Sequence, residues 1–118
     1  MEHRRLGRSG LKISKLALGT MNFGNPTGKT ESFKIINTAL DAGINILDCA
    51  DVYADGESER IIGEALAENG KRKDVLVTSK VFLPTGKGPN DAGNSKHHIL
   101  NACENSLKRL KTDWIDIY

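Results

Sequence analysis

Residues 43–63, GINILDCADVYADGESERIIG, predict a buried strand between two helices. Gly43 is a typical helix stop, the apolar run Ile44–Leu47 is typical of a strand, and a second helix is expected to begin near Ser58. Asp48 lies where the strand ends and a polar loop begins, and Tyr53 follows in that loop. A strand flanked by helices is the repeating unit of a parallel α/β sheet.

Similar units are predicted on both sides of this stretch. A β-hairpin is expected over residues 3–14, because Gly7 and Gly10 can supply its turn. A short apolar strand over 16–18 ends at Gly19-Thr20-Met21. The remaining elements are expected to be helices over residues 31–42, 58–69 and from 95 onward, and strands over 75–81 and 114–118.

Caps and buried faces of the helices follow from the same patterns. Thr30, Ser58 and Ser95 each precede a helical pattern and are expected to be N-caps. The third helix is expected to bury one apolar stripe, made of Ile99, Cys103, Leu107 and Leu110.

The predicted order is a hairpin followed by β-α-β-α-β-α-β, which implies right-handed crossovers and a parallel sheet. With 118 residues, the chain is expected to form a single domain over residues 1–118. Two architectures remain open at this point. One is an open doubly wound sheet, and the other is part of a (β/α)8 barrel, which needs about 250 residues to close.

Composition excludes some classes of function. The net charge of +2 is mild and the basic residues are scattered, so no nucleic-acid partner is expected. No apolar run reaches the roughly 20 residues that a membrane span needs. Cys49 and Cys103 have no neighbours at metal-binding spacing, so we expect reduced thiols, no metal site and a cytoplasmic protein.

Asp48, Tyr53 and Lys80 form the main candidate site. Asp48 and Lys80 end two neighbouring strands, which lie about 4.8 Å apart in a parallel sheet, so they can form an ion pair. Active sites of parallel sheets are built at this end of the strands. A lysine beside Tyr53 would favour the phenolate and help the phenol act as a general acid. A structural salt bridge beside an unrelated tyrosine is the alternative.

Two other motifs favour ordinary explanations. Residues 24–30 imitate a phosphate-binding loop, but only three residues separate the glycines where that motif has four. We therefore expect a plain loop. His97 and His98 point about 100° apart on a helix, which makes a poor metal pair, and both are expected to be exposed.

Several segments resemble the aldo-keto reductases. The match is carried by residues 43–53 with Gly56-Glu57-Ser58-Glu59 and Gly63-Glu64-Ala65-Leu66, and by four further segments, at 6–11, 18–21, 77–81 and 106–118. The resemblance implies a (β/α)8 TIM-type barrel truncated to about half, with an N-terminal hairpin. It also implies NAD(P)H-dependent reduction of a small aldehyde or ketone.

The resemblance implies roles for particular residues. Tyr53 would be the proton donor, assisted by Lys80 and Asp48. The backbone at Gly19-Thr20-Met21, with Asp48, would lie near the nicotinamide, and NADPH would be favoured over NADH. The family's fourth catalytic residue is a histidine just beyond the fourth strand, and this chain ends at Tyr118 before that position.

The missing histidine and the truncation of the barrel lead to the remaining expectations. Activity is expected to be weak, because losing one positioned catalytic group commonly costs about 10²–10⁴-fold in rate. Open strand edges favour a homo-oligomer. The alternatives are a catalytically silent relic that binds a nucleotide or a protein, and a part of a longer enzyme.

Overall fold

The strand predicted within residues 44–47 lies at the centre of a three-stranded parallel sheet. It is β4 (Ile46–Asp48), flanked by β3 (Leu18–Gly19) and β5 (Leu76–Thr78). In register, Leu47 lies opposite Leu18 on one side and Val77 on the other. The computed structural model describes the whole chain, from Met1 to Tyr118.

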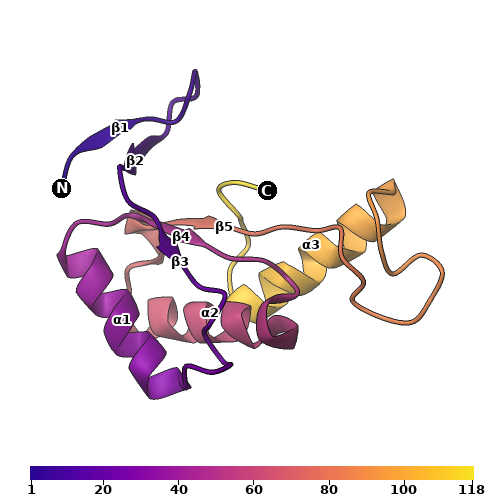
Figure 1. Cartoon of the computed structure of the whole chain (residues 1–118). Coiled ribbons are helices and arrows are strands. Elements are labelled where there is room, and N and C mark those ends of the chain that lie inside the picture. The colour runs from indigo at the N-terminus through magenta and orange to yellow at the C-terminus, as the bar shows by residue number, and fades with distance from the viewer.

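Three helices connect and follow the strands: α1 (Lys29–Asp41), α2 (Glu57–Asn69) and α3 (Lys96–Leu110). Short 3-10 turns, η1 (Tyr53–Gly56) and η2 (Arg72–Asp74), precede α2 and β5. The helices lie in one layer on the same side of the sheet (Figure 1). A doubly wound sheet carries helices on both faces, so the arrangement is that of consecutive units of a (β/α)8 barrel. None of the helices combines the length and the apolar composition that a membrane-spanning helix requires.

The predicted hairpin is present as β1 (His3–Arg5) and β2 (Lys12–Ser14), paired antiparallel. It projects from the end of the sheet where β4 begins (Figure 1). The Ser14 amide donates to Asn45 Oδ1 over 2.8 Å, and the Asn45 amide donates to Ser14 Oγ over 3.1 Å. These bonds attach the hairpin to the start of β4.

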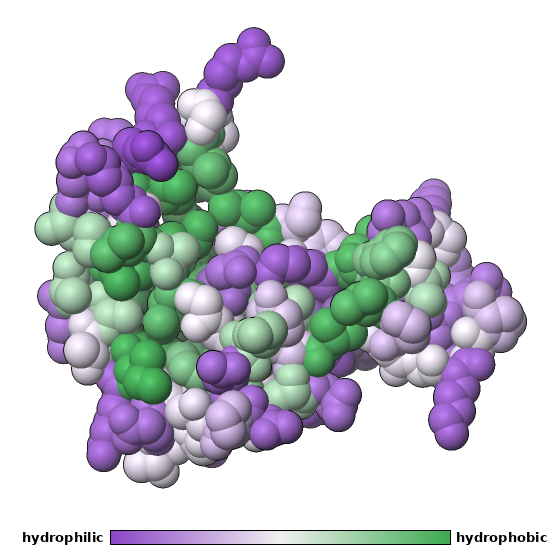
Figure 2. Space-filling model, viewed as in Figure 1, coloured by the Kyte–Doolittle hydropathy of each residue, from purple (hydrophilic) through white to green (hydrophobic).

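The hydrophobic core lies between the sheet and the helix layer. Leu47 and Val77 point toward the helices, with no more than 1% of either exposed, and the core continues through Ile36, Ile61, Ile62, Leu66 and Leu110. The opposite face of the sheet has no helix over it. Figure 2 shows hydrophobic areas left at the surface between hydrophilic ones.

The expected fourth strand, residues 114–118, is not formed as a strand. The segment makes a single parallel bridge, between Ile117 and Thr78. The Val77 amide donates to the side chain of Asp116, Oδ2, over 2.9 Å. That carboxylate takes a backbone donor which a regular ladder would use, so pairing stops at one bridge.

The buried face of α3 differs from the predicted one. His98, Ala102, Ser106 and Leu110 are buried, whereas the predicted Ile99, Cys103 and Leu107 are only half-buried. Small residues on this face let α3 approach α2 closely. At Gly63 of α2, a β-carbon would lie 2.6 Å from the carbonyl of Leu110. The expectation that His98 is exposed was therefore wrong, since only 3% of it is exposed, while His97 is exposed.

One of the three predicted N-caps is confirmed. Ser95 Oγ accepts a hydrogen bond from the His98 amide over 3.0 Å. Helix α1 begins after Gly28, and α2 begins after Gly56, neither with a side-chain cap. Thr30 lies inside the first turn of α1, and Ser58 is used in a buried hydrogen-bond network instead.

Candidate active site

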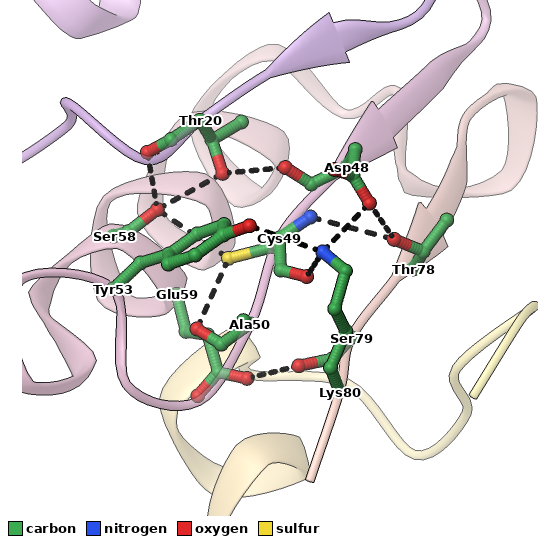
Figure 3. A network of polar contacts seen from close by, with 10 residues as sticks. All are labelled: Thr20, Asp48, Cys49, Ala50, Tyr53, Ser58, Glu59, Thr78, Ser79 and Lys80. Carbon is green, nitrogen blue, oxygen red and sulfur yellow. Dashed lines mark hydrogen bonds and ion pairs between the residues drawn. The ribbon is translucent and has the colours of Figure 1, made fainter. Parts of the chain in front are cut away.

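Asp48 and Lys80 lie together at the carboxyl end of the sheet. Asp48 is the last residue of β4, and Lys80 follows β5 by two residues. Lys80 Nζ lies 2.8 Å from Asp48 Oδ1, and the side chains are 47% and 44% exposed (Figure 3). The two residues therefore form an ion pair that solvent, and hence a small molecule, can reach.

The phenol of Tyr53 joins this pair. Tyr53 follows β4 in the turn η1, and Lys80 Nζ donates to its hydroxyl over 3.3 Å. Lys80 Nζ also donates to the Cys49 carbonyl over 2.6 Å. A lysine ammonium has three N–H donors, and here each has an acceptor. Of the three side chains predicted from the sequence, Asp48 and Tyr53 thus both contact the nitrogen of the third, Lys80.

The environment keeps Lys80 protonated. Burial acts to lower its pKa, but the hydrogen bonds to Asp48 and Tyr53, together with the negative charge of Asp48, outweigh burial and raise the pKa above its ordinary value. Lys80 therefore remains a cation throughout the neutral range.

The turn that follows Tyr53 has an unusual backbone. Ala54, Asp55 and Gly56 have successive φ values of 49°, 53° and 89°, all in the left-handed region. For a residue with a β-carbon this conformation costs on the order of 1 kcal/mol, and such strain is concentrated at functional sites. At Gly56 a β-carbon would also lie 2.8 Å from Cδ of Arg109. The turn folds the chain sharply, so that Tyr53 faces Lys80 while α2 begins beneath it.

The end of β3 lies beside Asp48. Gly19 pairs with Asp48 in register, and nothing lies within 4 Å of the position of a β-carbon on Gly19. The Thr20 side chain is fully buried and donates to the Asp48 carbonyl over 3.0 Å. Met21 is 62% exposed. The backbone at Gly19 therefore borders open space, whereas the buried Thr20 side chain is unable to contact a ligand there.

Sequence reasoning missed several residues of the site. Thr78 Oγ1 donates to Asp48 Oδ1 over 3.0 Å, and side-chain alternation along β5 could have indicated this, because Thr78 and Lys80 point to the same face. Ser58 Oγ donates to the Thr20 carbonyl over 2.8 Å, and Ser79 Oγ donates to Glu59 Oε1 over 2.6 Å. No local pattern indicates these last two bonds, since each joins distant segments.

A cavity of about 200 Å³ adjoins Tyr53 and Lys80. Its other walls are mostly apolar: Ala50, Asp51, Val52, Val81 and Leu83. A larger hollow of about 860 Å³ lies between the C-terminal ends of α2 and α3, where it is lined in part by Trp114, and neither Asp48, Tyr53 nor Lys80 lines it. Of these two hollows, only the smaller one is lined by the phenol of Tyr53 and the ammonium of Lys80.

Comparisons with known proteins identify relatives along almost the whole chain. Residues 15–118 match the model of the aldo/keto reductase family. The chain is 43% identical, over 99% of its length, to a probable voltage-gated potassium channel subunit beta from Oryza sativa subsp. japonica. It is 44% identical, over its full length, to an uncharacterized oxidoreductase, YrpG, from Bacillus subtilis. The chain spans 36% and 39% of those two proteins, respectively.

A solved structure shows the same fold. The aldo-keto reductase AKR11C1 from Bacillus halodurans, in its holo form, superposes with a TM-score of 0.87 at 38% identity. The match covers 100% of this chain and 39% of that one.

Proposed function

This chain belongs to the aldo/keto reductase family, and on that premise we propose that its site reduces an aldehyde or ketone to an alcohol with NADPH, in preference to NADH. The observation that carries the proposal is the position of Lys80. Its Nζ donates to both the Tyr53 hydroxyl and the Asp48 carboxylate. The phenol oxygen therefore accepts from the lysine, and its own proton is left for a substrate.

Each of the three side chains then has a task. Tyr53 donates its proton to the carbonyl oxygen as the carbon is reduced. The Lys80 ammonium, 3.3 Å away, stabilises the phenolate that remains. Asp48 holds the ammonium in place over 2.8 Å and keeps it charged. Solvent can return the proton to Tyr53, because Lys80 and Asp48 are about half-exposed.

We propose that the nicotinamide end of the cofactor lies beside Asp48. The open backbone at Gly19 offers a flat surface, and Met21 extends beyond it into solvent. When bound, NADPH supplies the hydride that adds to the carbonyl carbon. The apolar cavity beside Tyr53 would hold the small carbonyl substrate. The buried, reduced Cys49 supports the cytoplasmic location that we also propose.

The test is NADPH oxidation by the 118-residue protein, measured against a panel of aldehydes and ketones. Tyr53→Phe removes the proton donor and is expected to lower kcat by at least about 10²-fold, with NADPH binding retained. Tyr118→Phe is the matched control, because the chain has only two tyrosines. Equal turnover by the parent and Tyr53→Phe would refute the role of Tyr53.

A second candidate is a binding role without turnover. Two plant relatives, from Oryza sativa and Arabidopsis thaliana, are named as probable potassium channel subunits rather than as enzymes. On this reading the chain binds a nucleotide or a protein and reduces nothing. NADPH binding without oxidation of NADPH by any carbonyl in the panel would favour this candidate.

A further inference from the structure

Glu59 is a fully buried carboxylate next to the proposed catalytic residues. None of its surface is exposed. Ser79 Oγ donates to its Oε1 over 2.6 Å, and Arg109 Nε donates to its Oε2 over 2.6 Å. Burying a charge is costly unless it is paired and hydrogen-bonded, and here both oxygens have a short, charge-assisted partner. Such a group is rigidly held.

The bond to Ser79 acts on the backbone immediately before Lys80. Side chains alternate along a strand, so Thr78 and Lys80 point to the face that carries Asp48, while Ser79 points back toward α2. Figure 3 shows the Glu59 carboxylate joined to Ser79 on that side, with the Lys80 nitrogen on the other. Fixing Ser79 therefore fixes the point from which the Lys80 side chain starts.

Glu59 also lies near the turn that carries Tyr53. It lies in the first turn of α2, which begins directly after η1. Its partner Arg109 packs under that turn, against Gly56. One carboxylate thus connects the turn of Tyr53 with the strand of Lys80.

We propose that Glu59 is a positioning residue, which acts through Ser79 to hold the Lys80 ammonium at hydrogen-bond distance from the Tyr53 hydroxyl. The inference rests on the proposed function in giving that distance a catalytic meaning. The distance itself, 3.3 Å, is already at the long end for a hydrogen bond. A small displacement of Lys80 would therefore break the contact, and misplacing a catalytic group by about 1 Å can cost up to roughly 10²-fold in rate.

The alternative is that Glu59 and Arg109 only stabilise the fold. Replacing Glu59 leaves the half-buried Arg109 without its carboxylate partner and risks unfolding the chain, so Glu59 itself is a poor test. Ser79→Ala is sharper, because it deletes the link toward Lys80 and leaves the Glu59–Arg109 pair and every charge in place. Ser32→Ala is the matched control: Ser32, in α1, is also fully buried, but its hydroxyl donates to the carbonyl of Gly28, just before that helix, over 2.8 Å.

The readout is the reactivity of the Lys80 amine, measured as the rate of its acetylation by an amine-specific reagent and followed by mass spectrometry of the digested protein. Only the neutral amine reacts, and the contacts with Asp48 and Tyr53 raise the pKa of Lys80, so slow acetylation is expected in the parent protein. Tyr53→Phe removes the contact in question and is expected to speed acetylation of Lys80. Ser79→Ala is expected to act in the same direction, and Ser32→Ala to leave the rate unchanged. In the turnover assay, Ser79→Ala is expected to lower kcat about tenfold with little change in KM.

Each outcome decides a separate claim. If Ser79→Ala is acetylated at Lys80 at the parent rate while Tyr53→Phe is acetylated faster, Glu59 does not position Lys80, and the inference is wrong. If Ser32→Ala speeds acetylation as much as Ser79→Ala does, the effect is general loosening, which also overturns the inference. The acetylation measurement needs no turnover, so an inactive protein would count against the proposed function and leave this test intact.

Discussion

Lys80 is the residue on which the chemistry of this site depends. A surface lysine is ordinarily mobile, but here all three donors of its ammonium are directed at acceptors, on Asp48 at the end of β4, on Cys49 directly after it and on Tyr53 in η1. The raised pKa of Lys80 means that the ion pair with Asp48 is intact at neutral pH and is lost only as the pH rises above the ordinary lysine value. Its charge is therefore a constant feature of the site under physiological conditions.

The burial of Cys49 leads to a testable prediction about the reactivity of its thiol. Its thiol is fully buried, and burial raises its pKa above the ordinary value, against the opposing hydrogen bonds from Ser58 and Thr20. Thiolate is the reactive form, so Cys49 is expected to be inert in the folded protein, while the half-buried Cys103 reacts. An aromatic disulfide reagent should therefore titrate one thiol before unfolding and two after it. Rapid labelling that persists in Cys103→Ser would contradict this.

The helices differ in whether a side chain caps their N-terminus. Ser95 caps α3 through the His98 amide, so Ser95→Ala is expected to lower the free energy of unfolding by about 1 kcal/mol. Thr30 has the same sequence signature but lies inside α1 and makes no cap. Thr30→Ala should therefore change the free energy by no more than a few tenths of a kcal/mol. Urea unfolding, followed by the fluorescence of the sole tryptophan, measures both; equal losses would show that the caps are wrongly assigned.

The order of the elements could be predicted from the sequence, whereas the buried face of α3 could not. The order of strands and helices follows from apolar runs and glycine stops, and it places Asp48 and Lys80 at one end of neighbouring strands. The face of α3 was not predictable from apolar residues alone. Close approach to α2 at Gly63 selects the small residues Ala102 and Ser106 for the interface.

Contacts between distant segments were likewise not predictable from local sequence patterns. Asp116 replaces part of a strand ladder with its side chain. Ser58 and Ser79 bind partners 38 and 20 residues away along the chain. Local sequence patterns indicate the periodicity of strands and helices and the positions of turns. They therefore locate the candidate site, but they do not identify the residues from distant segments that support it.

At the scale of the whole molecule, the outstanding feature is the sheet face without helices. Large hydrophobic side chains are exposed in the molecule, among them Met21, Phe82 and Leu83, each more than half-exposed. Exposed apolar surface and open strand edges promote association. We therefore propose that the 118-residue protein forms a homo-oligomer. Sedimentation velocity at micromolar concentration is expected to show species larger than 12.9 kDa that dissociate on dilution; a stable monomer would rule this out.

The proposed carbonyl reduction can be tested by following the transferred hydride with a deuterium label. NADPH deuterated at the hydride-donating carbon of the nicotinamide is incubated with the protein and the carbonyl panel, and the alcohols are analysed by mass spectrometry. If the site is a carbonyl reductase, the parent protein yields an alcohol with one deuterium on the former carbonyl carbon, and Tyr53→Phe yields at least about 10²-fold less. If no carbonyl in the panel gives a deuterated alcohol with the parent protein, the proposed reductase activity is contradicted.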